Sequence, residues 1–151
     1  ALNPNLHITD IVIGEKTVQH DMDTSAIGDP VGLVSGINVV FFDSDKYVVE
    51  TIEKAAKELQ LVNMRGTVAC GDRFVSDSET KKKIVENFSA DACDMESAAM
   101  SHVCYINSVP FGAIRAISDG ADGDAQMDYP TFASLAAKRG IALTDKFIEI
   151  V

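Results

Sequence analysis

The sequence has 151 residues, of which 46% are hydrophobic and 24% charged, a balance typical of a chain that folds as one globular domain. Thirteen Lys and Arg against 23 Asp and Glu leave a net charge of −10, the wrong sign for binding a nucleic-acid backbone or an anionic membrane surface. No apolar run approaches the roughly 20 residues that a membrane span needs, so we expect neither a nucleic-acid partner nor a membrane partner.

Cysteine usage indicates a reducing compartment. Cys70, Cys93 and Cys104 form no C-x-x-C pair, and an odd number of cysteines is a poor disulfide framework. The chain also opens without a basic stretch followed by an apolar segment, so no secretory signal is visible. We therefore expect a cytoplasmic protein.

The first third of the chain predicts strands, a long loop and a helix. The apolar run Ile8–Ile13 predicts a strand, and Lys16–His20 is a candidate second strand that pairs with it. Gly and Pro residues predict a long loop over 21–36, of the kind that serves as a lid or an interface. Ser44 is the expected N-cap of a helix whose apolar residues recur at spacings of three and four: Val48, Val49, Ile52, Ala55, Ala56 and Leu59.

The rest of the chain alternates between strand and helix patterns. We expect, in order, a strand over 64–70, a helix over 78–88, a strand over 92–95, a buried helix over 96–106, a strand over 111–119 and a helix over 129–151. Apolar strands alternating with helices predict an α/β fold whose sheet is mostly parallel or mixed and covered by helices. Ligands bind beyond the carboxyl ends of such strands, which selects 70–76, 95–96 and 118–119.

Asp119 and Arg115 are candidates for chemistry at the last strand. Asp119 follows an apolar run with Ser118 beside it, and a half-buried carboxyl there can act as a general acid. The alternative is a turn or helix-cap residue that opens the 120–123 loop. Arg115 shares a strand face with Asp119 and needs an acidic partner or an anionic ligand, so a structural ion pair with Asp119 or Glu96 is equally consistent with the spacing.

Two further positions carry candidate binding groups. Asp94 and Glu96 stand at a strand-to-helix junction, where the helix dipole alone favours an acid, but a carboxylate there can also accept the two vicinal hydroxyls of a sugar. Phe74 lies in a polar loop, where an aromatic ring either covers a flat ligand or anchors the loop to the core.

Other patterns favour ordinary structural roles. The acids and histidine of 20–23, and His102 with Cys104, lack a credible set of metal ligands, so we expect no metal. Lys81–Lys83 is most simply the solvated face of a helix. The sequence holds no P-loop, no G-x-G-x-x-G and no G-x-S-x-G motif.

Three motifs, in order and at matching spacings, resemble a known family. They are VACGDRFV over 68–75, CDMESAAMSHVC over 93–104 and VPFGAIRAISD over 109–119, and the opening 9–13 and His20-Asp21 also fit. Together they are similar to the 5′-methylthioadenosine/S-adenosylhomocysteine nucleosidases of the nucleoside phosphorylase superfamily. The resemblance extends over essentially the whole chain and implies an α/β sandwich.

The resemblance also implies roles for particular residues. Phe74 would stack on adenine while the Val75 backbone bonds its edge, and Met95 and Glu96 would hold the ribose, Glu96 through the hydroxyls. Asp119 would protonate adenine N7, Ser118 would orient Asp119, and Arg115 would help organise the site around the attacking water. No cofactor is implied, and the substrate is a small nucleoside whose N-glycosidic bond is hydrolysed to release adenine.

The sequence departs from the family pattern at its N-terminal end. Family members carry further N-terminal strands and a water-activating Glu, so we expect residues 1–151 to be the C-terminal portion, about two-thirds, of one such domain. A purine nucleoside phosphorylase is the enzymatic alternative, distinguished by a dependence on phosphate, and a non-catalytic nucleoside-binding fragment is the third possibility. The acidic surface and small-residue helix suit a homodimer, with the 20–36 loop as a candidate interface and cover for the alkylthio group.

Overall fold

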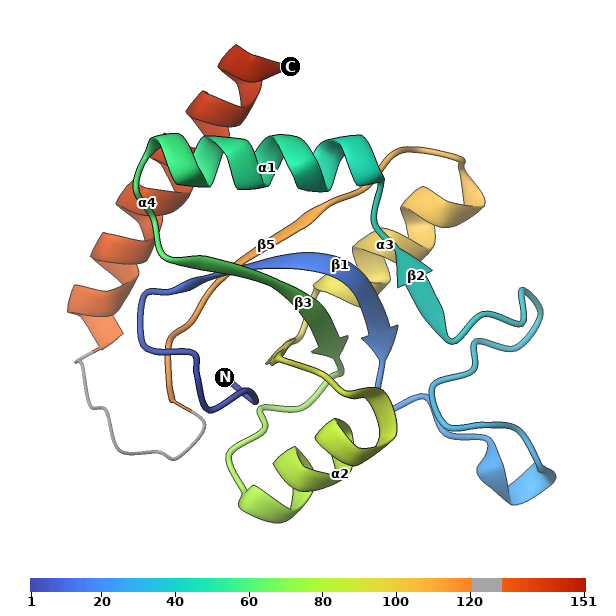
Figure 1. Cartoon of the computed structure of the whole chain (residues 1–151). Helices are drawn as coiled ribbons and strands as arrows, with labels where there is room; N and C mark the ends of the chain where they lie inside the picture. The colour runs from blue at the N-terminus through green and yellow to red at the C-terminus, as the bar shows by residue number, and fades with distance from the viewer. Residues whose placement is uncertain (121–128) are drawn as a thin grey trace.

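The computed structural model describes residues 1–120 and 129–151, which form a five-stranded mixed sheet flanked by helices (Figure 1). Its elements in chain order are β1 (Ile11–Gln19), the 3-10 helix η1 (Ser25–Ile27), β2 (Phe41–Asp43), α1 (Lys46–Glu58), β3 (Asn63–Cys70), α2 (Ser78–Phe88), β4 (Ala92–Asp94), α3 (Ser97–Ile106), β5 (Ala113–Ala116) and α4 (Tyr129–Ile150). The predicted α/β class is confirmed.

β1 lies at the centre of the sheet and pairs with three strands. β3 runs parallel to it along its whole length, and β4 continues this parallel part beyond β3. β5 pairs antiparallel with the first half of β1, at Ile11 to Gly14, and β2 pairs antiparallel with the second half, at Lys16 to Val18. The sheet is therefore mixed, with its parallel part formed by β1, β3 and β4.

The prediction of two paired strands within 8–20 is wrong, because β1 is continuous through Gly14 and Glu15. The chain does not turn there; instead the register with β3 shifts between Gly14 and Lys16, as at a β-bulge. A Cβ on Gly14 would lie 3.0 Å from the Cβ of Ala113, so the glycine lets β5 approach closely.

α1 and α4 pack together over one end of the sheet, and α2 lies at the other end (Figure 1). Leu143 of α4, Ile52 of α1 and Ile13 of β1 belong to one buried cluster. The N-cap of α1 is Asp45 and not the predicted Ser44: the Asp45 carboxylate accepts a hydrogen bond from the Val48 N–H at 3.0 Å. Ser44 instead donates its hydroxyl to the carbonyl of Gly14 at 2.6 Å.

α2 covers a second buried cluster. Ile84 and Phe88 pack with Val18 of β1 and Ala69 of β3. Asp77 caps the helix by accepting from the Thr80 N–H at 2.8 Å. Of the predicted solvated lysines 81–83, the last two are exposed, whereas Lys81 is partly buried and donates to the carbonyl of Gly120 at 3.3 Å.

α3 is less buried than its composition predicts. Ala98 and Ser101 are buried beneath it, and Ser101 shares a 2.5 Å hydrogen bond with Thr17 of β1. The opposite face exposes Met100, Val103 and Ile106, each by more than half. The expectation that this helix is buried is wrong for that face. None of the helices in the described part of the chain is long and apolar enough to span a membrane.

The last strand is shorter than the predicted 111–119, since β5 ends at Ala116. The predicted loop over 21–36 contains only η1 and a bridge from Val34 to Val39 just beyond it. Residues 121–123, part of the turn considered for Asp119, lie outside the described residues. α4 begins at Tyr129, so Asp119 does not cap it.

Candidate functional site

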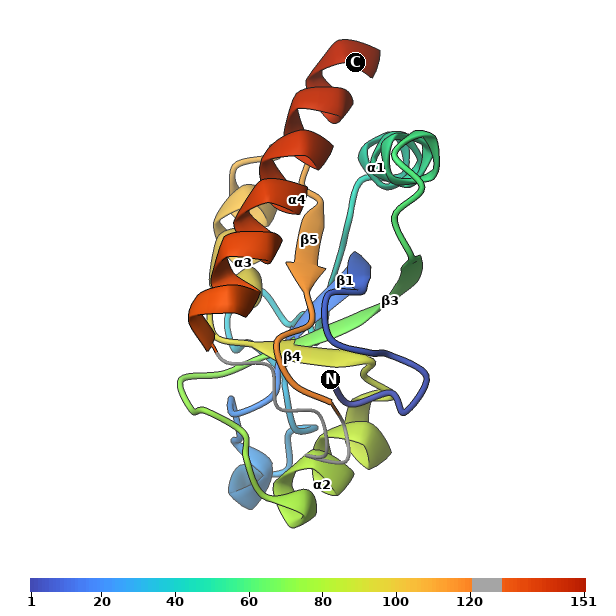
Figure 2. The same ribbon diagram turned by 90° about the vertical axis from the view of Figure 1, so that its left-hand side faces the viewer.

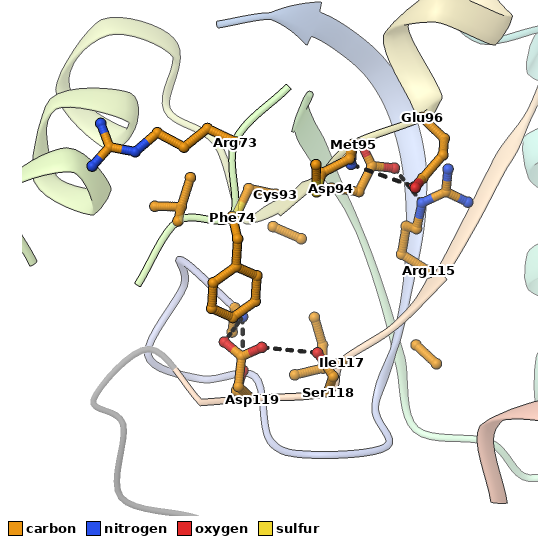
Figure 3. A pocket seen from close by; sticks show the side chains of 14 residues that line it. Arg73, Phe74, Cys93, Asp94, Met95, Glu96, Arg115, Ile117, Ser118 and Asp119 are labelled. Atoms are coloured by element: carbon orange, nitrogen blue, oxygen red, sulfur yellow. Dashed lines mark hydrogen bonds and ion pairs between the residues drawn. The ribbon is translucent and has the colours of Figure 1, made fainter. Parts of the chain in front are cut away.

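One pocket joins the three chain segments that the sequence analysis selected. Its cavity is about 350 Å³, at the lower end of the range for small-molecule sites. It lies between the loop after β3, the β4–α3 junction and the segment from β5 to Asp119, and all seven predicted site residues line it: Phe74, Val75, Met95, Glu96, Arg115, Ser118 and Asp119 (Figure 3).

The loop 71–76, which follows β3, presents an aromatic ring to this pocket. Phe74 is 71% exposed, so its side chain is not a core anchor, and the core-anchor alternative is wrong. Val75, the next residue, is buried and packs in the cluster with Ile84 and Phe88. In Figure 3 the Phe74 ring points toward Asp119, and the wall it offers is a flat apolar surface suited to stacking.

Arg115 is held by Asp94, not by either of the partners considered from the sequence. Its Nε donates to Asp94 Oδ2, and its Nη1 donates to the carbonyl of Ile114 at 2.9 Å. The Asp94 side chain is 8% exposed, and Asp94 Oδ1 also accepts from the Ser97 hydroxyl at 2.8 Å. Asp94 thus connects Arg115 of β5 with Ser97 at the start of α3. The charge of its carboxylate is compensated by the charge-assisted hydrogen bond from Arg115.

Sequence reasoning underrated Asp94. The signal was present, because an Asp just before a helix can accept from the free N–H groups of the first turn, and Asp94 Oδ1 accepts from the Ser97 N–H at 3.3 Å. With Asp94 engaged by Arg115 and Ser97, the adjacent Glu96 remains exposed at the pocket wall. Met95 is 44% exposed beside it. The junction therefore offers a carboxylate and a thioether side chain to a ligand.

Asp119 reaches the pocket by a route that the carboxyl-end rule does not describe. β5 runs antiparallel to β1, so its end lies at the opposite edge from the ends of β3 and β4. The chain continues past β5, where the Ile117 N–H donates to the carbonyl of Asp10 at 3.0 Å, and the N-terminal nitrogen of Ala1 donates to the carbonyl of Asp119 at 2.7 Å. Figure 2 shows the N-terminus beside β4 and this segment.

The carboxylate of Asp119 is oriented but accessible. Ser118 Oγ donates to Asp119 Oδ2 at 2.8 Å, and the Asp119 side chain is 48% exposed. A carboxyl group fixed by a neighbouring hydroxyl at the wall of a pocket can exchange a proton with a bound ligand. The ion pair between Arg115 and Asp119 that the spacing left open does not form, and the side chain that contacts this carboxylate is Ser118.

The cysteines near the site are unreactive thiols. Burial raises the pKa of the Cys93 thiol, which lines the pocket, and raises the pKa of Cys70, which ends β3, to about 11. Neither is a thiolate nucleophile near neutral pH. Among residues 1–120 and 129–151, no group of three or more His, Cys, Asp and Glu side chains is arranged to hold a metal ion.

The family follows from the sequence as a whole. The family sequence model described as the phosphorylase superfamily matches residues 1–149 of this chain. The chain belongs to the phosphorylase superfamily. Among known proteins, the aminodeoxyfutalosine nucleosidase of Campylobacter jejuni is 40% identical over 138 residues, a match that covers 91% of this chain and 60% of that protein.

Two solved structures share the fold of this chain. The crystal structure of the Campylobacter jejuni 5′-methylthioadenosine/S-adenosyl homocysteine nucleosidase has a TM-score of 0.94 and 38% identity, covering 99% of this chain and 65% of that one. The futalosine hydrolase of Helicobacter pylori has a TM-score of 0.91 and 28% identity, covering 100% and 64%. This chain therefore spans somewhat less than two-thirds of the length of the relatives it matches.

Proposed function

We propose that this chain carries the base-binding and ribose-binding part of a nucleosidase that hydrolyses the N-glycosidic bond of 5′-methylthioadenosine and S-adenosylhomocysteine, releasing adenine. The observation that supports this most strongly is the convergence on one pocket of an exposed aromatic ring, Phe74, an exposed carboxylate, Glu96, and a second carboxylate fixed by a hydroxyl, Asp119. An aromatic ring can stack on a flat base, an exposed carboxylate can accept the two hydroxyls of a ribose, and an oriented carboxyl group can transfer a proton.

In the proposed complex, adenine stacks on Phe74 and its edge bonds the backbone of Val75. The ribose lies against Met95, with its hydroxyls donating to Glu96. This order places the base on the Asp119 side of the pocket and the sugar on the Glu96 side, which agrees with the positions of the labelled side chains in Figure 3. The pocket thereby orients both halves of the nucleoside around the bond to be broken.

Asp119, oriented by Ser118, donates a proton to N7 of adenine as the glycosidic bond breaks. Protonation makes adenine a better leaving group and draws electrons out of that bond, leaving positive charge on the ribosyl group. Water adds to this cation and loses one proton to a base, which the proposal places outside residues 1–151. Arg115 helps to organise the water's surroundings from the position in which Asp94 holds it.

The group at the 5′ carbon of the substrate is a separate question. The relative that is 40% identical carries the name aminodeoxyfutalosine nucleosidase, whereas the structure with a TM-score of 0.94 is a methylthioadenosine/S-adenosyl homocysteine nucleosidase. Aminodeoxyfutalosine is therefore a third candidate substrate. All three candidates require the same base and ribose contacts, and they differ where the 20–36 loop is proposed to cover the 5′ group.

The decisive experiment uses a purified longer polypeptide that contains residues 1–151. It measures base release from methylthioadenosine, S-adenosylhomocysteine and aminodeoxyfutalosine in phosphate-free buffer, with kcat/KM compared among them. The proposal expects free adenine and an unphosphorylated sugar from the first two. A preference for aminodeoxyfutalosine would replace the substrate but keep the chemistry. Turnover only with added phosphate, yielding a sugar phosphate, would identify a phosphorylase instead.

We further propose that residues 1–151 form the C-terminal portion of a single nucleoside phosphorylase-like domain, since the matches span 60% to 65% of the relatives. On this view the pocket binds adenine but water activation needs residues outside this chain. The chain alone is expected to bind adenine with little hydrolysis, and a longer polypeptide to hydrolyse at an enzyme-like rate. Efficient hydrolysis by residues 1–151 alone would contradict this.

A further inference from the structure

The ends of two neighbouring strands meet just before the 71–76 loop. β1 ends at Gln19 and β3 at Cys70, and these residues are partners in the parallel register. His20 and Asp21 therefore emerge beside Gly71 and Asp72. The backbone N–H of Asp72 donates to Asp21 Oδ2 at 2.7 Å, a side-chain contact between residues far apart in the chain.

Gly71 shows how closely these segments fit. A Cβ at this position would lie 2.5 Å from His20 Nε2 and 2.9 Å from the carboxylate of Asp21, distances that real Cβ atoms do not reach. On its other side the Gly71 N–H donates to the carbonyl of Asp94 at 3.2 Å. The start of the loop is thus fixed between the end of β1 and the end of β4.

The exposed ring of Phe74 depends on this backbone fixation. With 71% of the residue accessible, packing contributes little to its position. The loop is instead anchored before the ring by the bonds at Gly71 and Asp72, and after it by the buried side chain of Val75. An aromatic wall that is held in place loses less conformational freedom when a ligand stacks on it.

We propose that Asp21 is a positioning residue: its carboxylate fixes the 71–76 loop so that Phe74 is preorganised to stack on the base. This inference rests on the proposed function, because it assumes that the loop binds adenine. It assigns a role to Asp21 and connects the 20–36 loop to the loop that carries Phe74. Asp21 contacts no substrate in this proposal and acts through the Asp72 N–H.

The variants Asp21→Ala and Asp21→Asn test this role, with Asp23→Ala as the matched control. Alanine removes the acceptor, whereas the asparagine side-chain carbonyl can still accept from the Asp72 N–H. Asp23 lies in the same loop and accepts from the Ser25 N–H at 2.9 Å, so its loss also removes one backbone contact, but not one to the 71–76 loop.

Two measurements apply to each variant: the dissociation constant for adenine, and hydrogen exchange of the amides at 72–74. Asp21→Ala is expected to bind adenine about 3- to 10-fold more weakly, the range for one lost hydrogen bond, and to lose amide protection at Asp72. Asp21→Asn retains most of both, and Asp23→Ala retains both. In the hydrolysis assay of the longer polypeptide, Asp21→Ala raises KM more than it lowers kcat, because a stacking contact is made before and during the reaction.

The outcomes separate the two proposals. If the unsubstituted protein binds adenine and Asp21→Ala binds it equally well, the positioning role is overturned while the proposed function stands. If Asp23→Ala weakens binding as much as Asp21→Ala, the effect is a general loosening of the 20–36 loop and the role is also overturned. If the unsubstituted protein binds no adenine, the proposed function is overturned and the inference falls with it.

Discussion

The Ser118 hydroxyl orients the carboxylate of Asp119, and about half of the Asp119 side-chain surface is exposed at the pocket. Asp119→Asn keeps the size and the bond to Ser118 but cannot donate an acidic proton to N7. We expect hydrolysis by the active protein to fall on the order of 100- to 10,000-fold, with an unchanged melting temperature.

The measurement is the rate of adenine release at saturating substrate. Ser118→Ala is the companion variant, since it leaves the acid but removes its orienting hydroxyl, and it is expected to be impaired less than Asp119→Asn. Near-normal adenine release by Asp119→Asn would exclude Asp119 as the general acid.

Phe74 tests whether an exposed ring serves a ligand or the fold. Phe74→Ala is expected to weaken adenine binding by about 1–3 kcal/mol, the cost of losing an aromatic stacking partner. The melting temperature should scarcely move because the ring buries little surface. Titration calorimetry and thermal unfolding check both, with Phe74→Tyr as a control that keeps an aromatic face. A collapse in melting temperature with unchanged affinity would refute the stacking role.

The sequence motifs identified the residues that line the pocket, but not the contacts among them. Strand alternation placed Arg115 on one face with Asp119, an argument that requires the strand to reach residue 119. β5 ends at Ala116, so the alternation stops and Arg115 pairs with Asp94 of β4. Contacts between segments far apart in sequence depend on strand order and strand ends, which local periodicity does not contain.

At the scale of secondary structure, the start of α1 depends on a single side chain. Asp45→Ala removes the cap on the Val48 N–H and is expected to lower the free energy of unfolding by about 1 kcal/mol. Denaturant unfolding measures this, and Asp45→Asn, which can still cap, should be close to the unsubstituted protein. Equal destabilisation by both variants would assign the effect to charge and not to capping.

The helices were easier to predict than the strands. α1 shows the 3.6-residue period and α2 begins after a capping Asp, both of which are local signals. Two paired strands, 8–13 and 16–20, were predicted where β1 is one continuous strand through Gly14. Here the glycine accommodates Ala113 of β5, a strand about a hundred residues later, and nothing near Gly14 in the sequence indicates that approach.

For the molecule as a whole, the exposed face of α3 bears on the expected homodimer. Met100, Val103 and Ile106 recur at a spacing of three on this helix, each more than half exposed. Apolar side chains gathered in this way are typical of an interface. We expect a second copy of the chain to cover this face.

Val103→Lys should then convert the dimer to a monomer in sedimentation equilibrium, because burying an unpaired ammonium is costly. Val85→Lys is the matched control, since Val85 is a partly exposed valine on α2, away from α3. An unsubstituted protein that sediments as a monomer, or a Val103→Lys variant that remains dimeric, would rule out this interface.

Because β1 pairs with three strands, the sheet is complete only when all three have been synthesised. The first half of β1 pairs with β5, at 113–116, so about a hundred residues are synthesised between the two partner strands. During synthesis, the Ile11–Gly14 edge of β1 stays unpaired until β5 emerges from the ribosome. Closing so long a loop makes sheet completion slow and late. An apolar, half-paired strand of this kind is a candidate for chaperone protection until β5 has been made.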